Sequence, residues 1–493
     1  MSYDANGTEV AGRGWYFMEN MKDTQWDFAL VLRQKYQEEI FRRRLQDLGV
    51  GLEAPVEVTN VLVDESVEEG GYRITATTKH GVTGVEETIK SKYLIGADGG
   101  RSFVRRALDI PFDGNTTEDK WVRIDGVIET DMPKNRVYGA IESPTHGNVL
   151  WAALDRGATR IGFAFTAERQ KGYPEFNEAA AVAEAIASVK PFSLKFKQVD
   201  WYTVYSVGQR VARDFFTKGC VFLAGDACHT HSSGAAQGMN TGMHDAVNLG
   251  WKLSLVLKGL APPSLLHTYQ SERLPNVQKL INYDKDISRL MTMQLPIGWR
   301  GVPTADPNEV LGVVMEEAST FTSGLSIAFD DTVLNANGSL ASSTVSPGQR
   351  GPDVELTKPG TREITRLHKQ TPNVARFHVV LFAGEPVHTS VDLRAFSDAY
   401  HSSPLFSDSK VPISWLTIPA AEGPSAYELL GVMPLGKVFY DEKQTAHKRY
   451  GVDVEKGGLV VLRPDGWVAT STVLEAVAVK ELEGYFKSVL ACN

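Results

Sequence analysis

Cysteine is scarce in this chain: only Cys220, Cys228 and Cys492 occur among 493 residues. An odd number of thiols without a C-x-x-C pair excludes a disulfide framework and a cysteine-rich zinc site. Because free thiols persist in a reducing compartment, the sequence predicts a cytoplasmic protein. Cys492, next to the C-terminus, is interpreted as an incidental thiol.

Excess positive charge, long apolar runs and a targeting segment are also missing. The net charge is -9 and the longest basic run is Arg42-Arg43-Arg44, which argues against nucleic acid as a main partner. No stretch approaches the roughly 18 apolar residues of a membrane span. The N-terminus is polar and acidic, unlike a signal peptide. The sequence therefore predicts no membrane partner.

The most informative segment is 219–259, which begins GCVFLAGDACHTHSSGAAQGMN. An apolar strand is predicted to end at Gly225-Asp226, and after a loop of small residues a long helix is predicted to begin near Gly238-Met239. A carboxylate at the end of a strand, facing a helix N-terminus, is a site for polyols and anions.

A second segment, GADGGRS at 96–102, repeats this design. A buried strand ends in Asp98, the glycines permit close backbone approach, and Arg101 can meet an anion. Together the two segments resemble the flavin-binding motifs of class A FAD-dependent aromatic hydroxylases, most closely those of the phenol 2-monooxygenase family.

The resemblance implies roles for eight residues. Asp226, after Gly225, would bind the ribityl chain, and the helix start at Gly238, Met239 and Asn240 would face the pyrimidine edge of the flavin. Asp98 and Arg101 would contact the flavin side chain, and Gln34 matches a helix glutamine near the ring or ribityl chain.

The family's opening strand, G-x-G-x-x-G turn and helix are not found. Gly12-Arg13-Gly14 has no apolar strand before it and no third glycine before a helix. We therefore expect an α/β fold of the para-hydroxybenzoate hydroxylase type without its first βαβ unit, which binds ADP. A shortened gene, a separately supplied piece and a natural loss remain alternative explanations.

The loop before the helix departs from the family pattern HxHxPxxGQGMN. Ser233 stands in place of the proline and Ala236 in place of a glycine, whose absent side chain allows close approach to a flat ring. With the missing ADP unit, these changes predict that FAD, the cofactor implied by the resemblance, binds weakly or not at all. NAD(P)H is expected to act only where FAD is functional.

Five regions are predicted along the chain. They are a remnant of the flavin-binding domain at 1–120 (with 206–295), a mixed substrate-domain β-sheet at 121–205, a second flavin-motif segment with helices at 206–334, a linker at 335–352 and a C-terminal domain at 353–493. The last resembles the thioredoxin-like domain of phenol 2-monooxygenases. It has no C-x-x-C pair, so it is assigned structure or homodimer contacts.

Catalytic and substrate-binding candidates come from the same reasoning. Asp226, His229 and His231 are candidate acid–base groups. The histidine pair is interpreted as ordering the loop, and no metal site is predicted because no third ligand is near in sequence. The candidates for lining a substrate cavity in the sheet are Trp151, Arg160, Phe163, Trp201 and Tyr205.

Three functions remain compatible with the sequence. The first is a flavin monooxygenase that hydroxylates a phenolic or polyketide-type aromatic small molecule. The second is a cofactor-independent cyclase, dehydratase or isomerase on the same scaffold. The third is a non-catalytic binding or scaffold protein, because a fold alone does not decide function. Bound flavin would give the purified protein a yellow colour, which the other two would lack.

Overall fold

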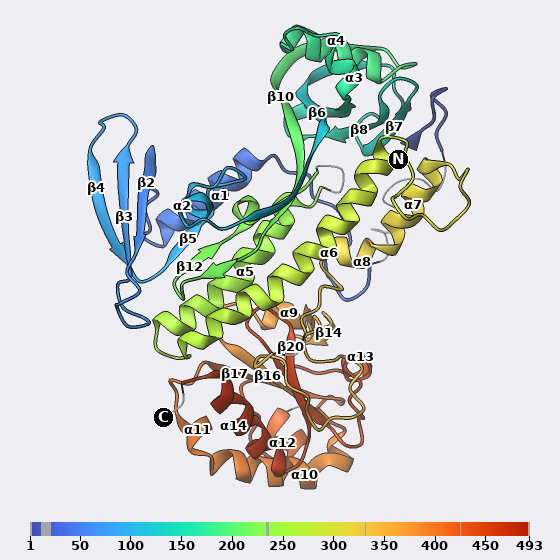
Figure 1. The fold of residues 1–493 in the computed structure, drawn as a ribbon. Coiled ribbons are helices and arrows are strands. Elements are labelled where there is room, and N and C mark those ends of the chain that lie inside the picture. The colour runs from blue at the N-terminus through green and yellow to red at the C-terminus, as the bar shows by residue number, and fades with distance from the viewer. Residues whose placement is uncertain (1, 11–20, 233–235, 331, 424, 492–493) are drawn as a thin grey trace. The chain divides into compact units, whose positions relative to one another are not determined.

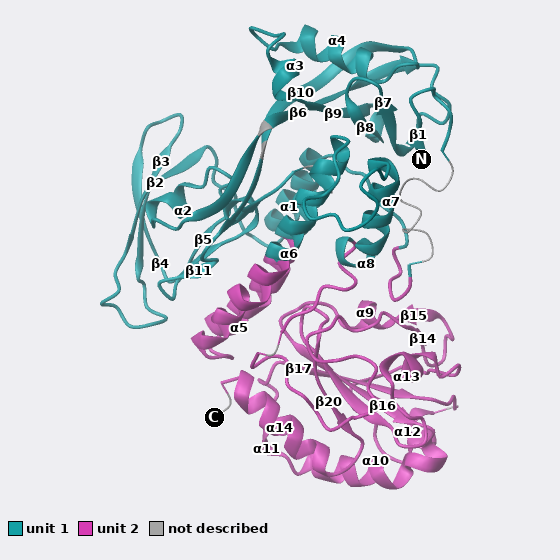
Figure 2. Ribbon diagram, turned by 45° about the vertical axis from the view of Figure 1, so that its right-hand side comes forward, with its two compact units in different colours: residues 1–21, 27–242, 277–322 teal, residues 22–26, 243–276, 323–493 magenta. Residues whose placement is uncertain are grey.

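The computed structural model describes residues 2–10, 21–232, 236–330, 332–423 and 425–491. The chain forms two compact units (Figure 2): a first unit of residues 1–21, 27–242 and 277–322, and a second unit of residues 22–26, 243–276 and 323–493. The border runs through two long helices, α5 (Gly238–Leu257) and α6 (His267–Met291), so each unit holds part of both. Neither these nor any other described helix has the length and hydropathy that a membrane span requires.

A seven-stranded sheet dominates the first unit, in the order β1-β7-β8-β9-β6-β10-β13. All its neighbours pair antiparallel except β1 and β7. The strands are β1 (Ser2–Tyr3), β6 (Phe112–Thr130), β7 (Tyr138–Ser143), β8 (Gly147–Ala153), β9 (Thr159–Phe165), β10 (Leu194–Ala212) and β13 (His229–Thr230). The mixed sheet predicted for 121–205 therefore extends beyond that region at both ends.

Helices cover the two faces of this sheet differently. The helices α3 (Ala167–Gln170) and α4 (Glu178–Ser188) lie over one face (Figure 1), where α4 packs its alanines against a core that contains Val122, Ile161 and Phe163. On the other face, α6 and α7 (Pro307–Glu317) pack against Trp121 and Ala164, and Asn308 of α7 accepts a hydrogen bond from Asn148 of β8 at 2.7 Å. The short helix α8 (Ser319–Thr322) follows α7.

A small sheet of the order β11-β12-β5 carries both predicted flavin motifs. Its strands are β11 (Phe216–Thr217), β12 (Val221–Leu223) and β5 (Leu94–Gly96), and helix α2 (Phe103–Ala107) follows β5. The strands β12 and β5 are parallel, as predicted for 93–98 and 220–224. The other side of β5 is an edge of the described sheet, and Ile95 there is 44% exposed.

Helix α1 (Gln34–Asp47) and a three-stranded antiparallel meander complete the first unit. The meander consists of β2 (Val56–Val63), β3 (Ile74–His80) and β4 (Glu86–Ser91). No residue of α1 is buried, although Ile40, Phe41 and Leu45 lie on it. Just before α1, the Arg33 guanidinium binds the carboxylates of Asp155 and Asp200 with nitrogen–oxygen distances of 2.6 and 3.0 Å.

The second unit contains a five-stranded sheet in the order β18-β17-β16-β19-β20. Its parallel strands are β16 (Phe377–Gly384), β17 (Ile413–Pro419) and β18 (Lys437–Val438), and β19 (Gly458–Leu462) and β20 (Val468–Val473) run antiparallel to their neighbours. The other elements are β14 (Glu355–Thr357), β15 (Ile364–Arg366), α9 (Leu367–Gln370), α10 (Pro386–His401), α11 (Pro404–Ser407), α12 (Ala426–Leu430), α13 (Thr445–Tyr450) and α14 (Val477–Val489).

Both faces of this sheet are buried, which explains why β16 and β19 consist almost entirely of apolar residues. One face packs with α10, α14 and the α5 residues Trp251 and Leu255, and the other packs with α13. The structure thus shows the expected central sheet flanked by helices in the last 140 or so residues.

The prediction of a linker at 335–352 is wrong. Two residues of this segment contact β20. The amide of Ala336 donates to the carbonyl of Ala469 at 2.9 Å, and Ser339 Oγ lies 2.9 Å from Thr472 Oγ1. The Gly348 amide likewise donates to Val468 at 2.8 Å. A segment rich in glycine and serine has low intrinsic order, but here its backbone finds hydrogen-bond partners along a strand.

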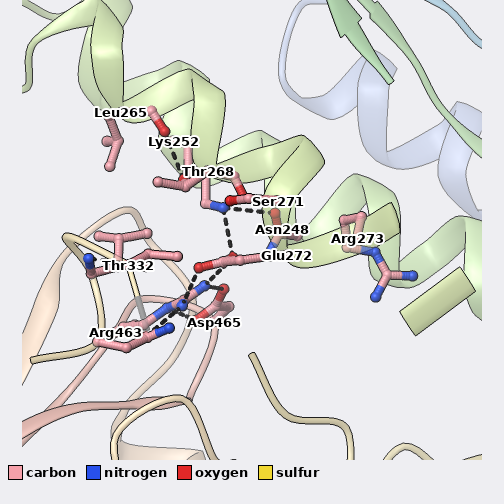
Figure 3. Close-up of polar contacts among 12 residues, drawn as sticks. Asn248, Lys252, Leu265, Thr268, Ser271, Glu272, Arg273, Thr332, Arg463 and Asp465 are labelled. Carbon is pink, nitrogen blue, oxygen red and sulfur yellow. Dashed lines mark hydrogen bonds and ion pairs between the residues drawn. The ribbon is translucent and has the colours of Figure 1, made fainter. Parts of the chain in front are cut away.

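A cluster of fully buried charges joins α5 and α6 to the turn after β19 within the second unit (Figure 3). The Glu272 carboxylate accepts hydrogen bonds from Arg463 at 2.7 and 2.9 Å, from Lys252 at 2.7 Å and from Asn248 at 2.7 Å. Arg463 also donates to Asp465 at 2.8 Å. Two cations therefore face two anions, which offsets the large penalty of burying each charge.

The pKa values in this cluster follow from burial and pairing. Burial alone raises the pKa of Glu272, but Arg463 and Lys252 overcome it and hold the pKa at about 2. Burial lowers the pKa of Lys252 to about 8, although Glu272 raises it. Glu272 is thus ionised at neutral pH and depends on its cationic partners.

Three buried histidines predict acid sensitivity of the second unit. Burial is the largest cause that lowers the pKa of His244, His368 and His378 to about 4. An unfolded histidine has a pKa of about 6.5. Between these two pKa values the folded unit therefore binds fewer protons than the unfolded chain. Its stability falls as the pH drops below about 6.5 and is unaffected above it. We expect each histidine to lower the free energy of unfolding by about 2 kcal/mol at about pH 5 relative to pH 7.

Urea unfolding of His378→Gln at the two pH values checks this expectation. Glutamine retains a donor for the Pro372 carbonyl, which the His378 Nε2–H reaches at 3.0 Å. Between pH 7 and pH 5, the free energy of unfolding of the variant should fall by about 2 kcal/mol less than that of the wild type. The matched control is His388→Gln, because that imidazole is 47% exposed. Equal pH dependence in wild type and His378→Gln would contradict the assignment.

Candidate functional site

The turn after β12 brings a carboxylate to the start of α5. Gly225 has a φ of 60°, a left-handed conformation that favours glycine, and Asp226 follows it with an exposed side chain. A Cβ on Gly242 would lie only 3.5 Å from the Gly225 Cα, so the turn passes closely against α5. The pair of glycines thereby holds Asp226 beside the first turns of the helix.

The start of α5 presents amides that have no acceptor within the helix. Its first intrahelical hydrogen bond runs from the Thr241 amide to the Gln237 carbonyl at 2.9 Å. The amides of Gly238, Met239 and Asn240 precede this bond and have no intrahelical acceptor. Met239 is 47% exposed and Asn240 is exposed. This end of the helix can therefore bind an anion or a polarised carbonyl.

The second motif lies at the same edge of the small sheet. In the parallel pair, Gly96 of β5 is opposite Leu223 of β12, so Asp98 and Asp226 both follow the carboxyl ends of neighbouring strands. Asp98 accepts hydrogen bonds from the amides of Phe103 at 2.7 Å and Val104 at 3.1 Å. Asp98 thus caps α2 while its side chain stays exposed.

Arg105, rather than the exposed Arg101, connects the two motifs. It is buried and donates to the carbonyls of Ala227 at 2.7 Å and Gly100 at 2.9 Å. Sequence reasoning did not identify Arg105. The only signal was its place one helical turn after Arg101 at the start of a predicted helix.

Asp284 of α6 holds the loop between β13 and α5. Its buried carboxylate accepts from the Ser232 amide at 2.7 Å, from Ser232 Oγ at 2.6 Å and from Gln209 Nε2 at 2.8 Å. All three donors come from residues at least 52 positions away in sequence, so no local pattern identifies the group. Asp284 fixes the position from which the loop leads to α5.

Of the two predicted histidines, His231 lies beside this carboxylate, with its Nδ1 3.9 Å from Asp284 Oδ1. His229 and His231 have nearly parallel rings 6.5 Å apart, and His229 is fully buried. Burial is the main cause that lowers the pKa of His231, and its Nδ1 donates to the Ser232 carbonyl at 2.8 Å. His231 Nε2 has no hydrogen-bond partner among the described residues and lies near Gly238. His231 therefore lies next to the helix start, and a loop-ordering role of the two histidines stays a prediction.

Of the two loop positions that depart from the family pattern, the structure describes Ala236. Ala236 has a φ of 53°, a conformation that costs a non-glycine residue about 1–2 kcal/mol. The glycine that the family pattern has at this position would adopt it without strain. Ser233 lies outside the described residues. Gln34 is exposed on α1 and donates to Glu38 at 2.8 Å.

The substrate-cavity candidates divide between two faces of the large sheet. Alternate residues of a strand point to opposite faces, so Arg160 and Phe163 of β9 cannot line the same cavity. Trp151 pairs with Ile161, and both Trp151 and Phe163 belong to the core under α4. We therefore exclude Trp151 and Phe163 from the candidate site.

The opposite face, which we call the arginine face, includes a group of six polar or aromatic residues. They are Arg123 and Asp125 of β6, Tyr138 of β7, Arg160 of β9, and Trp201 and Tyr205 of β10, placed together by the strand register. Sequence reasoning had identified Arg160, Trp201 and Tyr205 and had missed the other three. Strand alternation within β6 and β7 would have indicated them once the register was known.

These side chains interact closely. Arg160 binds Asp125 through two nitrogen–oxygen contacts of 2.7 and 2.8 Å, and its guanidinium carbon lies 5.9 Å from the Trp201 ring centre. The Arg123 guanidinium carbon lies 5.7 Å from the Tyr205 ring centre. Burial raises the pKa of Tyr138 to about 12, although Arg123 and Arg160 both lower it. Tyr138 thus remains a hydrogen-bond donor beside two guanidinium groups.

The chain matches known protein families and is similar in sequence to known enzymes. Residues 3–284, more than half of the chain, match the FAD binding domain family, and residues 406–493 match the phenol hydroxylase C-terminal dimerisation domain. A phenol 2-monooxygenase of Aspergillus fumigatus is 29% identical over 433 residues, covering 82% of this chain and 71% of the relative. A 3-hydroxybenzoate 4-monooxygenase of Comamonas testosteroni is 29% identical, covering 87% and 74%.

Solved structures agree with the fold. The flavin-dependent monooxygenase PieE, solved with FAD and substrate, has a TM-score of 0.69 at 23% identity and covers 92% of this chain and 79% of its own. Aklavinone-11 hydroxylase, solved with FAD and aklavinone, has a TM-score of 0.68 at 20% identity, with coverage of 94% and 78%. From the match over residues 3–284, the chain belongs to the family of FAD-dependent aromatic hydroxylases that includes the phenol 2-monooxygenases.

Proposed function

We propose that this chain is an oxidoreductase that hydroxylates a phenolic or polyketide-type aromatic small molecule with FAD, NAD(P)H and oxygen. The observation that carries the proposal is the placement of Asp226 and three amides of α5 without an intrahelical acceptor at one edge of the β5–β12 sheet. The names of the relatives, which are monooxygenases of phenolic compounds, favour this function over the cofactor-independent and scaffold alternatives.

The residues around α5 fit the riboflavin half of FAD. Asp226 offers an exposed carboxylate to hydroxyl groups, and the amides of 238–240 offer donors to a ring carbonyl. The close approach of the Gly225 turn to Gly242 keeps this carboxylate beside the start of the helix. When bound, FAD supplies the redox chemistry of oxygen activation. The chain's own residues bind and orient the ring, and Asp284 keeps the loop in place through Ser232.

The ADP half of FAD has no such counterpart among the described residues. In dinucleotide-binding folds the pyrophosphate lies at a helix N-terminus next to a central parallel strand. Here β5 forms an edge of the described sheet, with Ile95 44% exposed, and α1 leaves Phe41 54% exposed. We infer that the described residues bind the flavin ring and ribityl chain without contacts to adenosine.

This inference predicts similar affinities for FAD and riboflavin. Two or three charge-assisted contacts to the pyrophosphate, at about 1.5–3 kcal/mol each, would otherwise favour FAD by a factor of about one hundred or more. We expect both dissociation constants to be micromolar or weaker and to agree within about threefold. Titration of the 493-residue chain, followed by quenching of flavin fluorescence, measures both. Submicromolar FAD binding with far weaker riboflavin binding would contradict it.

The hydroxylation itself is tested at saturating FAD. With NAD(P)H, a phenolic substrate and isotopically labelled dioxygen, the product should carry one labelled oxygen atom, detected by mass spectrometry. The control omits FAD, which should abolish both NAD(P)H consumption and product. Product formed equally without FAD and without dioxygen would instead favour cofactor-independent chemistry.

The proposal also covers the oligomeric state of the protein and its cellular compartment. The match of 406–493 to a dimerisation domain supports a homodimer, which sedimentation equilibrium would detect as twice the 54.1 kDa of the chain. Cys220 and Cys228 are buried as thiols rather than as a disulfide, which fits a reducing compartment, so we propose the cytoplasm.

A further inference from the structure

The hairpin turn between β7 and β8 places a hydroxyl group against a buried imidazole. Thr145 is exposed in this turn, and its Oγ1 lies 2.8 Å from Nδ1 of His146, which is only 4% exposed. Gly147 ends the turn with a φ of 67°, and a Cβ there would lie 2.9 Å from the Met291 carbonyl oxygen. The turn therefore packs closely against the end of α6, which holds the two side chains in place.

A buried carboxylate lies on the other side of this imidazole. His146 Nε2 is 2.6 Å from Oε2 of Glu184 in α4. The same carboxylate accepts hydrogen bonds from Arg169 at 2.8 Å and from the Tyr173 hydroxyl. A second Arg169 nitrogen donates to the Thr145 carbonyl at 2.7 Å. The imidazole is therefore fixed between a hydroxyl group and a carboxylate.

The protonation states follow from these partners. Burial raises the pKa of Glu184, but hydrogen bonds from Tyr173 and His146 and the charge of Arg169 hold it below its usual range. An ionised carboxylate only accepts, so Nε2 of His146 carries a hydrogen. Burial lowers the pKa of His146 although Glu184 raises it, so the imidazole is neutral at pH 7. Its Nδ1 is then an acceptor, and the Thr145 hydroxyl donates to it.

This arrangement activates a hydroxyl group as a nucleophile. A hydroxyl that donates to a neutral imidazole, whose other nitrogen is oriented by a carboxylate, can lose its proton as it attacks a carbonyl carbon. The oxygen of Thr145 is accessible to a small reagent, whereas His146 and Glu184 are buried. The nucleophile is thus open to solvent, and the base and the carboxylate behind it are shielded.

We propose that Thr145, His146 and Glu184 form a second reactive site, which transfers the acyl group of small activated esters to Thr145 and then to water. In the first step the bond between Thr145 Oγ1 and the acyl carbon forms, and the hydroxyl proton passes to His146 Nδ1. The ester C–O bond breaks as the alcohol leaves with that proton. Water then attacks the acyl carbon in the same way and restores the threonine. Nothing is oxidised or reduced, so the site is independent of the proposed hydroxylation. Glu184 acts as a positioning residue through His146.

Acetylation of the full chain by p-nitrophenyl acetate, without flavin, tests this site. Acetyl-threonine accumulates because p-nitrophenolate leaves far more readily than a threonine alkoxide, and peptide mass spectrometry after an acid quench measures it. We expect Thr145 to be acetylated about 100-fold faster than Thr83, because general-base catalysis contributes at least that factor. Thr83 is a matched control in the turn between β3 and β4. It is also exposed beside a histidine, but His80 Nδ1 accepts the amides of Val82 and Thr83, both at 3.2 Å.

Variants test the nucleophile and the positioning residue separately. Thr145→Val should remove the initial burst of p-nitrophenolate, whereas Thr83→Val should leave it unchanged and Thr145→Ser, which keeps a hydroxyl, should retain it. The acetylation rate should rise with pH as His146 becomes neutral. In Glu184→Gln the midpoint of this rise should move to lower pH, because the carboxylate raises the pKa of His146.

Each result decides the proposal. Faster acetylation of Thr145 than of Thr83, with a burst that disappears in Thr145→Val, supports it. Equal acetylation of the two threonines in the wild-type chain overturns it, and this comparison does not depend on the folding of any variant. A burst that persists in Thr145→Val overturns it as well, and an unchanged midpoint in Glu184→Gln overturns the role of that carboxylate. Absence of hydroxylation, by contrast, contradicts only the proposed function.

Discussion

Replacing Arg463 by methionine should lower the free energy of unfolding of the second unit by about 3–5 kcal/mol. Arg463 donates two hydrogen bonds to Glu272 and two to Asp465, and all three side chains are at most 1% exposed. Methionine fills the volume of the stem but leaves both buried carboxylates short of a cation. Lys252 still contacts Glu272, so the carboxylate stays ionised in an environment that now stabilises it less.

The matched control for this variant is Arg449→Met in the same unit. Arg449 also pairs with a carboxylate, that of Asp23, but its side chain is 48% exposed. An exposed pair contributes at most about 1 kcal/mol, so this variant should shift the midpoint of thermal unfolding little. Differential scanning calorimetry of the two variants measures the contrast. Equal shifts would show that the buried cluster contributes no more than a surface ion pair.

Replacing Asp284 by alanine should destabilise the first unit by about 3–5 kcal/mol and weaken riboflavin binding more than tenfold. The variant removes the acceptor for the Ser232 amide, the Ser232 hydroxyl and the Gln209 amide, all in a buried environment. Donors left without partners there carry a desolvation penalty of about 1–3 kcal/mol each. The loop that leads to α5 loses its attachment, so the amides at 238–240 lose their fixed position.

Two further variants separate the effects of charge and of position. Asp284→Asn keeps one acceptor oxygen and should retain part of the stability and flavin affinity. Asp286→Ala, on the same helix and only partly buried, serves as the control and should change unfolding by less than about 1 kcal/mol. Urea unfolding and riboflavin fluorescence quenching measure both properties. Full riboflavin affinity in Asp284→Ala would mean that the loop is held by other contacts.

Local sequence patterns predicted the elements that depend on neighbouring residues. The apolar runs at 93–98 and 220–224 each end in Gly-x-Asp or Gly-Asp, and they form the parallel pair β5 and β12. The helix predicted from Gly238 to about Lys258 is observed as Gly238–Leu257 and ends before Gly259. In both cases the signal is local, because an apolar period and a terminating glycine lie within one short segment.

Contacts between distant residues could not be predicted in this way. Glu272 and Arg463 are 191 positions apart, and Ser232 and Asp284 are 52 positions apart. Each side chain on its own has the sequence pattern of a solvated charge, and only the fold makes it a buried partner. The choice of Trp151 and Phe163 as cavity residues failed for a related reason. Residue type indicated aromatic surface, whereas the face to which a strand residue points depends on strand register.

The sharing of α5 and α6 between the two units has a consequence for chimeric enzymes. An exchange of C-terminal domains among relatives would be cut most naturally after residue 322, where α8 ends. Such a cut would leave Lys252, Asn248 and Glu272 in one parent and Arg463 in the other. A functional crossover must therefore transfer residues 243–276 together with 323–493, so that the inherited module is discontinuous in the gene.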